Sequence, residues 1–149
     1  MLTPTKNALF ALNVQCKVRP EVRQIKSDQQ CSRKDEPSCL QFVVGQDVKD
    51  DHTFYLFELY TDAQAFETHC KTPHFAVYDS FVKTKMPFKE DPVLCFYNTF
   101  DEDDESPKKR PIQKDAFGLN VNLYPKASIR DDFLNVISNN KKGTDSSEP

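Results

Sequence analysis

The organisation of this chain follows from one stretch, Thr53-Phe-Tyr-Leu-Phe-Glu-Leu-Tyr-Thr-Asp-Ala-Gln-Ala-Phe-Glu-Thr-His-Cys-Lys-Thr-Pro-His-Phe-Ala-Val-Tyr-Asp-Ser-Phe81. The stretch predicts a strand that carries a glutamate, a helix that ends in a histidine, and a second histidine at the start of another helix. These polar residues are Glu58, His69 and His74, and phenylalanines lie among them. An apolar pocket with few polar groups is typical of a small-molecule site.

The strand predicted from Phe54 to Tyr60 is apolar at nearly every position, so it has two hydrophobic faces. A strand with one solvated face alternates between apolar and polar residues, whereas a strand buried on both faces does not. We therefore expect a second layer on each side of the sheet that contains it.

Two helices are predicted after this strand. Asp62 is a good N-cap for a short helix that runs to about Cys70. Thr72 as N-cap and Pro73 at the first helical position predict a second helix that continues to about Lys85. The apolar residues of the second helix recur at helical spacing, which predicts one buried face.

The rest of the first hundred residues predicts three further strands and one helix. The strands are Ala8 to Val18, Ser38 to Gln46 and Pro92 to Phe100, and the helix runs from Pro20 to about Lys34. The order is β-α-β-β-α-β, with the second helical unit split in two. This order predicts an α+β fold, the ferredoxin-like split βαβ arrangement with one antiparallel sheet. Helices cover one face, so we expect a second subunit or a second domain to cover the other.

The chain divides into a domain over residues 1–100, a charged, proline-containing linker over 101–115, and a partial repeat over 116–149. The repeat is indicated by Phe117-Gly-Leu-Asn-Val-Asn122, which matches Phe10-Ala-Leu-Asn-Val-Gln15 position by position. It predicts the first strand and first helix of a truncated second copy, with the helix from Ser128 to about Asn140 capped by Gly143.

Charge and cysteine content exclude several classes of function. The net charge is −3, with 20 basic and 23 acidic residues, so neither a nucleic-acid partner nor a polybasic membrane signal is expected. No run of about 18 apolar residues exists that would cross a membrane. The five cysteines form no CxxC motif and no zinc-type spacing, which is typical of reduced thiols in a cytoplasmic protein.

Residues 8–100 resemble the antibiotic biosynthesis monooxygenase (ABM) family of dimeric α+β barrel proteins. The residues that carry the resemblance are Glu58 in Phe57-Glu-Leu-Tyr60, Ala65-Phe66, His69, and Thr72-Pro-His-Phe75. The resemblance implies two four-stranded sheets packed face to face, with their helices outward. It therefore implies a homodimer or intramolecular pairing with a second repeat, and a pocket between helices and sheet.

Members of this family oxidise polyphenols and quinols without a cofactor, degrade haem, or isomerise small signals, so the fold does not settle the chemistry. The haem-degrading branch uses an asparagine on the first strand, a tryptophan on the short helix and a haem-ligating histidine on the long helix. Asn13 matches the first, but the chain has no tryptophan, and Asp79 occupies the position of the ligating histidine. Haem degradation is therefore not expected.

For quinol-type oxidation, His69 is the natural base, because its ordinary pKa lies near neutrality. Glu58 is expected to orient His69 or to accept a proton itself, and Asn13 to offer its amide to a substrate oxygen. The expected substrate-binding residues are Phe66, His74, Phe75, Tyr78 and Phe81. No cofactor is expected. A metal site built from Glu58, His69 and His74 is not expected either, because their spacing matches no recognised ligand motif.

Structural roles fit the same residues. His69 also fits a contact with carbonyls at the end of its helix or a pairing with Glu58, and His52 fits an exposed position in a charged turn. Two functions therefore remain open. One is a cofactor-independent monooxygenase acting on a small phenol or quinol, and the other is a non-catalytic dimerisation or ligand-binding module of a larger multidomain protein.

Overall fold

The structure is a computed structural model that describes residues 9–19, 34–99, 116 and 118–147. The chain forms two compact units, residues 1–116 and 117–149, and each is described by itself. Most of the helix predicted from Pro20 to Lys34, and the linker predicted over 101–115, lie outside the described residues. In the part of the chain that is described, no helix is both long enough and apolar enough to cross a membrane.

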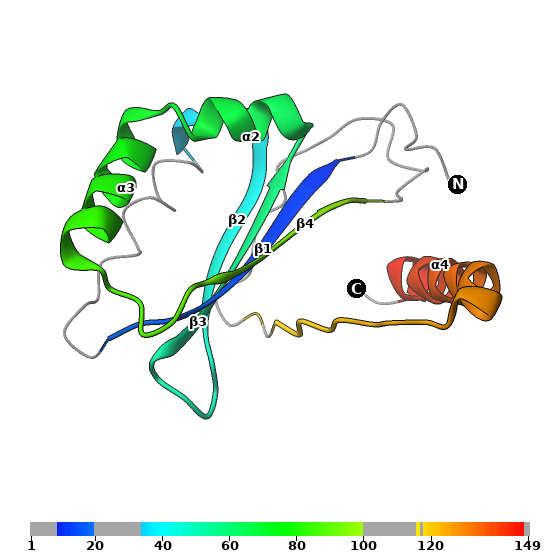
Figure 1. The fold of residues 1–149 in the computed structure, drawn as a ribbon. Coiled ribbons are helices and arrows are strands. Elements are labelled where there is room, and N and C mark those ends of the chain that lie inside the picture. Colours follow the sequence, from blue (N-terminus) through cyan, green and yellow to red (C-terminus); the bar gives the residue numbers. More distant parts are fainter. Residues whose placement is uncertain (1–8, 20–33, 100–115, 117, 148–149) are drawn as a thin grey trace. The chain divides into compact units, whose positions relative to one another are not determined.

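The first unit contains a four-stranded antiparallel sheet (Figure 1). Its strands are β1 (Phe10–Lys17), β2 (Cys39–Gln46), β3 (Thr53–Tyr60) and β4 (Val93–Asn98), in the spatial order β2-β3-β1-β4. Each neighbouring pair is antiparallel. This is the strand order of the ferredoxin-like fold, so the predicted fold class is confirmed.

Two helices follow β3, as the capping residues predicted. Helix α2 (Ala63–His69) begins after Asp62, whose Oδ1 accepts a hydrogen bond of 2.8 Å from the backbone N–H of Ala65. Helix α3 (Pro73–Lys85) begins after Thr72, whose hydroxyl accepts from the backbone N–H of Phe75. Figure 1 shows both helices on one side of the sheet.

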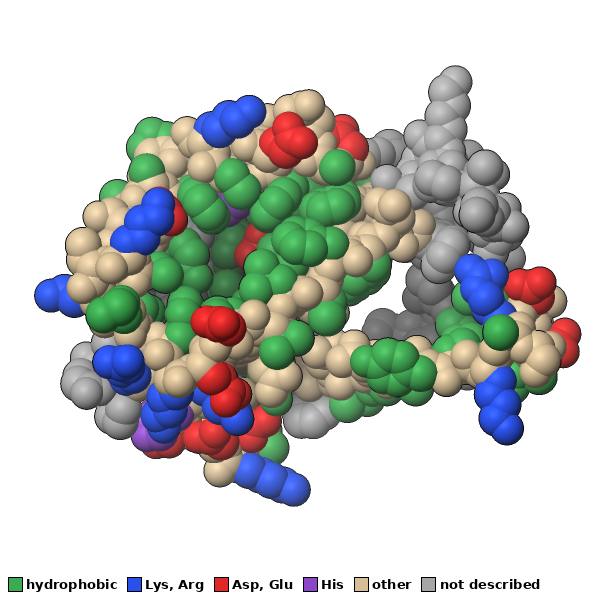
Figure 2. Space-filling model, in the orientation of Figure 1, with side chains coloured by type: hydrophobic (Ala, Val, Ile, Leu, Met, Phe, Trp, Pro, Cys, Tyr) green, Lys and Arg blue, Asp and Glu red, His purple; other side chains and the backbone are tan. Residues whose placement is uncertain are grey.

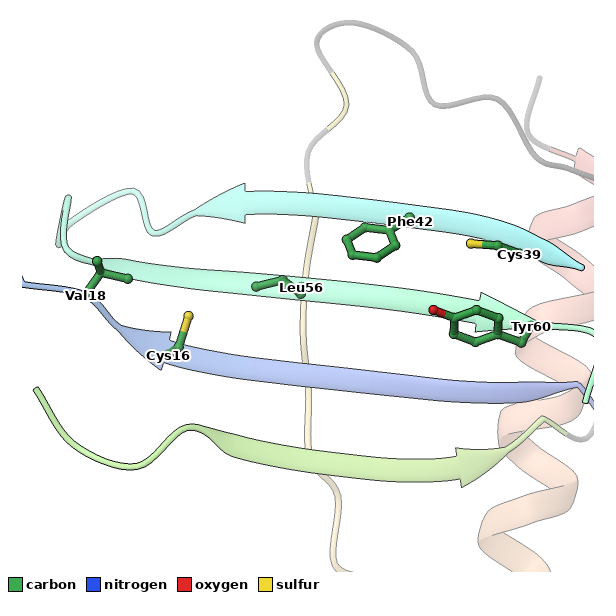
Figure 3. Close-up of a cluster of buried hydrophobic side chains, with 6 residues drawn as sticks. All are labelled: Cys16, Val18, Cys39, Phe42, Leu56 and Tyr60. Carbon is green, nitrogen blue, oxygen red and sulfur yellow. The ribbon is translucent and has the colours of Figure 1, made fainter. Parts of the chain in front are cut away.

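The core lies on both faces of the sheet. On the face toward α2, a buried cluster is formed by Cys16, Val18, Cys39, Phe42, Leu56 and Tyr60 (Figure 3). Burial raises the pKa of the Cys16 thiol to about 11, so this cysteine stays neutral and packs as a small hydrophobe. On the opposite face, a second buried cluster is formed by Leu9, Ala11, Leu40 and Leu59. The two clusters agree with the two hydrophobic faces predicted for β3.

Strand β4 lies at one edge of the sheet and exposes apolar side chains on both faces. Strand alternation places Val93 and Tyr97 on the face away from the helices and Leu94 and Phe96 on the helix face. Val93 is 59% exposed and Leu94 is 51% exposed. An exposed edge strand of this kind offers both backbone hydrogen bonds and apolar surface to a partner.

The described part of the second unit contains one α-helix, and the partial repeat stays a prediction. Residues 118–126, where the strand was expected, adopt neither helix nor strand, since a strand needs a neighbour for its backbone hydrogen bonds. A short 3-10 turn, η1 (Ala127–Ile129), leads into helix α4 (Arg130–Ser147). The helix was predicted to stop near Asn140, but it continues through Gly143, because a glycine is tolerated inside a helix at a cost of about 1 kcal/mol.

Phe42 is the best single probe of the core, because its side chain is 1% exposed in the centre of the cluster on the helix face. We expect Phe42→Ala to lower the free energy of unfolding by about 3–5 kcal/mol through lost burial and the remaining cavity. Urea denaturation followed by circular dichroism measures this loss. Val48→Ala, at a position that is 81% exposed, is the matched control and should change the stability by less than about 0.5 kcal/mol.

Candidate active site

Two consecutive helices and a segment that is distant from them in sequence meet at one carboxylate. Glu36 precedes β2, and its backbone carbonyl accepts from the N–H of Cys39 at 3.2 Å. His69 is the last residue of α2, and His74 is the second residue of α3. The Thr72 hydroxyl donates a 2.7 Å hydrogen bond to the His69 carbonyl, which closes the turn between the helices and brings the two imidazoles together.

One oxygen of Glu36 contacts both histidines. Its Oε1 lies 2.9 Å from Nδ1 of His69 and 2.7 Å from Nε2 of His74. The His69 side chain is 2% exposed, and those of Glu36 and His74 are 12% and 14% exposed. This cluster of Glu36, His69 and His74 is called the Glu–His–His cluster below. It reaches from the interior to the surface.

The shared carboxylate sets the tautomers of both rings. An ionised carboxylate only accepts hydrogen bonds, so His69 donates from Nδ1 and His74 donates from Nε2. A neutral His69 in this tautomer carries its lone pair on Nε2. Glu36 therefore orients His69 so that Nε2 is the atom able to accept a proton.

Aromatic rings surround His69. Ring centroids lie 5.2 Å away for Phe75, 5.7 Å for Tyr60, 6.1 Å for Phe42 and 6.5 Å for Phe66. Figure 2 shows hydrophobic side chains gathered over the side of the sheet that carries α2 and α3, with a histidine visible among them. Rings packed at these distances hold the imidazole in place and provide an apolar wall.

Glu58 and Tyr60 form a second buried polar pair on the helix face of β3. The Tyr60 hydroxyl donates to Oε2 of Glu58 at 2.8 Å, and both residues are buried. Burial, and then the negative charge of Glu58, raise the pKa of Tyr60 well above its ordinary value. Tyr60 therefore remains a neutral donor to the carboxylate.

Several of the predicted site residues gather around His69. His74 shares its carboxylate, and Phe66 and Phe75 contact its ring. Tyr78 extends the wall, with its ring 5.9 Å from that of Phe75, and Phe81 lies half-buried further along α3. His52 lies outside this group, in the turn before β3 beside Asp51, where its side chain is half-buried and not fully exposed as predicted.

Asn13 does not join the site. In the sheet it pairs with Phe57, whereas Glu58 pairs with Leu12, so strand alternation places Asn13 on the face away from the helices. There its amide donates to the hydroxyl of Tyr97 at 3.2 Å. The predicted contact of Asn13 with a substrate held beside His69 is therefore corrected, because the sheet lies between them.

The carboxylate that orients His69 was assigned to the wrong residue. The prediction named Glu58, but the carboxylate at hydrogen-bond distance from Nδ1 is that of Glu36. Glu36 stands beside Pro37 in a polar segment before β2, and 33 residues separate it from His69. A buried histidine requires a polar partner, so the sequence indicates that some polar residue contacts His69. It does not indicate that this residue is Glu36.

The Glu–His–His cluster is also the group able to hold a metal ion. One ligand atom from each residue lies within 4.8 Å of the other two. The trio considered from the sequence contained Glu58 in place of Glu36. The cluster in the structure therefore contains both histidines of that trio, but its carboxylate is that of Glu36 and not that of Glu58.

Residues 10–79 match the model of the antibiotic biosynthesis monooxygenase family. No curated protein matches the chain. Three solved structures illustrate the shared fold. A crystallised antibiotic biosynthesis monooxygenase is 23% identical with a TM-score of 0.54, over 60% of this chain and 97% of that one. A conserved protein of unknown function from Bacteroides thetaiotaomicron is 23% identical with a TM-score of 0.55, over 62% and 99%. A protein from Mycobacterium tuberculosis is 17% identical with a TM-score of 0.53, over 64% and 99%.

The buried Tyr60 hydroxyl makes the stability of the first unit sensitive to alkaline pH. Its pKa is raised in the folded state, so its contribution is complete below the ordinary tyrosine pKa of about 10 and is lost as the pH rises above it. Above about pH 10, we expect this residue to lower the free energy of unfolding by about 1.4 kcal/mol per pH unit. Tyr60→Phe should remove that part of the slope.

Urea denaturation at several alkaline pH values measures the slope. Tyr124→Phe is the control, since Tyr124 is 90% exposed and should keep the slope of the parent protein. Equal slopes in the parent and in Tyr60→Phe would contradict the expectation.

Proposed function

Residues 10–79 belong to the antibiotic biosynthesis monooxygenase family, and from this premise we propose that the chain oxidises a small phenol or quinol with O₂ and without a cofactor. The observation that carries the proposal is the buried imidazole of His69, oriented by Glu36 and enclosed by aromatic rings. This arrangement supplies a base in an apolar surrounding, which is what the oxidation of an electron-rich ring requires.

His69 accepts the phenolic proton at Nε2. Its Nδ1–H remains bound to the carboxylate of Glu36, which stabilises the imidazolium that forms and keeps the ring from rotating. The same division of labour between a carboxylate, an imidazole and a hydroxyl operates in catalytic triads. His74 adds a second donor to the same oxygen and lies at the more exposed side of the cluster.

The aromatic wall binds the substrate ring. Phe66, Phe75, Tyr78 and Phe81 provide apolar surface on α2 and α3, and buried aromatic side chains favour stacked or edge contacts with another ring. Glu58, held by Tyr60, is a second carboxylate on the same face of the sheet. We assign it a positioning role for a substrate hydroxyl.

The oxidation balances without an added reductant. A phenol or hydroquinone loses its proton to His69, and the resulting phenolate gives electrons to O₂. One oxygen atom enters the ring to form the quinone, and the other leaves as water. The substrate supplies all four electrons, so this stoichiometry requires neither flavin nor haem.

We also propose that the chain pairs as a homodimer through the face of the sheet away from the helices. The support is the apolar surface that remains exposed there on the edge strand, at Val93 and Tyr97. Covering this face with a second sheet would leave the helix face of each subunit available for a ligand.

The oxidation is tested by O₂ uptake with a panel of phenols and hydroquinones. We expect turnover by the parent protein and a loss of about 100-fold or more in His69→Ala, the size typical of a general base. Glu36→Gln should lose less, because the amide oxygen still accepts from one imidazole while the stabilising charge is gone. His52→Ala is the matched control and should keep the parent rate.

A folded parent protein that consumes no O₂ with any member of the panel would contradict the oxidation. It would favour the alternative, a ligand-binding or dimerisation module without catalytic activity. Equal rates for His69→Ala and the parent would remove His69 from the mechanism.

The dimer is tested by sedimentation equilibrium. We expect twice the mass of the chain for the parent protein and a shift toward the single-chain mass for Val93→Asp, because a charge buried in an interface is unfavourable. Leu94→Asp is the matched control, since the next residue of β4 points to the helix face and should leave the dimer intact. A monomeric parent, or equal behaviour of the two variants, would contradict the proposed interface.

A further inference from the structure

We propose that the Glu–His–His cluster binds one divalent first-row transition-metal ion, of the Zn²⁺ or Fe²⁺ class. Two imidazole nitrogens and one carboxylate oxygen converge there, and all three lie within 4.8 Å of one another. Two histidines and one carboxylate form a recognised ligand set for such ions.

The distances require only small movements. Oε1 of Glu36 lies 2.9 Å from one nitrogen and 2.7 Å from the other. In a tetrahedral site with bonds of about 2.1 Å, neighbouring ligand atoms lie about 3.4 Å apart. The carboxylate therefore needs to withdraw by a fraction of an ångström while the imidazole of His74 turns toward the ion. His74 is 14% exposed, in the first turn of α3, and is the ligand best placed to move.

The charges of the cluster suit a dication. At present one carboxylate oxygen accepts two N–H groups. When a metal ion binds the same three atoms, each neutral imidazole carries its proton on the other ring nitrogen, and the carboxylate of Glu36 contributes one negative charge to the dication. Ca²⁺ and Mg²⁺ are disfavoured, because these hard cations prefer oxygen ligands and two of the three ligands are nitrogen.

The surroundings provide one fixed ligand and an entry path. The His69 ring is held by Phe42, Phe66 and Phe75, so its nitrogen is preorganised. Glu36 and His74 retain some exposure, which gives an ion access from solvent. Three protein ligands leave at least one coordination position for water or an exogenous ligand, as in metal sites that are not purely structural.

Metal binding does not depend on the proposed oxidation, but it would affect that reaction. Coordination through Nδ1 leaves the proton of a neutral His69 on Nε2, the atom assigned as the base. On the premise of the proposed function, the ion is therefore an inhibitor that competes with catalysis.

Cobalt is the probe, since Co²⁺ substitutes for Zn²⁺ and its visible d–d absorption reports coordination without any turnover. The full chain is treated with a chelator, dialysed and titrated with Co²⁺. We expect one equivalent to produce intense d–d bands, without the charge-transfer absorption of a thiolate ligand. The bands should be unchanged in Cys70→Ser. This variant tests whether the half-buried thiol of Cys70 in the first unit is a ligand of the ion.

Variants assign the ligands. His74→Ala and Glu36→Gln should each weaken Co²⁺ binding by more than about 10-fold, the loss that even an outer partner of a metal ligand causes. His52→Ala should bind as the parent does. Circular dichroism checks folding, and Glu36→Gln, which keeps the size of the side chain, keeps the test valid if an alanine variant fails to fold.

A folded parent protein that gives no d–d bands at excess Co²⁺ overturns the proposal. Equal weakening by His52→Ala and His74→Ala also overturns it, because binding would then lie elsewhere. Absence of O₂ uptake with normal Co²⁺ bands would refute the oxidation and leave the metal site standing.

Discussion

The pairing of β3 with its two neighbours is the constraint on which the first unit depends. Strand β3 lies between β1 and β2, so its backbone groups are satisfied on both edges. Its side chains alternate between two buried clusters, with Leu56 and Tyr60 on one face and Leu59 on the other. A shift of one residue would exchange these faces and expose the core, so the register is strongly specified.

That register also determines what the site contains. Glu58 and Tyr60 are two residues apart and therefore share the helix face, where the hydroxyl can reach the carboxylate. Helix α2 begins directly after β3 and returns over this face, which brings its last residue, His69, against Phe42 and Tyr60. The positions of His69 and of the Glu58–Tyr60 pair thus follow from the position of one strand and the short connection after it.

The two proposals assign the Glu–His–His cluster two forms of chemistry with the same atoms. With protons between the three side chains it is an oriented base, and with a metal ion between them it is a coordination site. Both uses depend on a carboxylate that is nearly buried and on imidazoles that face it from two helices. The two uses exclude each other, because the proton and the metal compete for Nδ1 of His69.

Local sequence signals determined the strands, the two helix starts and the gathering of aromatic residues around His69. Asp62 and Thr72 act as caps through contacts within three residues, so the sequence alone determines them. The alternation of residues along β1 also predicts that Asn13 lies on the face opposite Phe10. The family resemblance nevertheless led us to place Asn13 in the site. Only the tertiary structure decided that Glu36 is the partner of His69, since 33 residues separate them and their contact depends on how β2 meets α2. Local patterns report which face a residue occupies, whereas a hydrogen bond between distant segments exists only once the chain has folded.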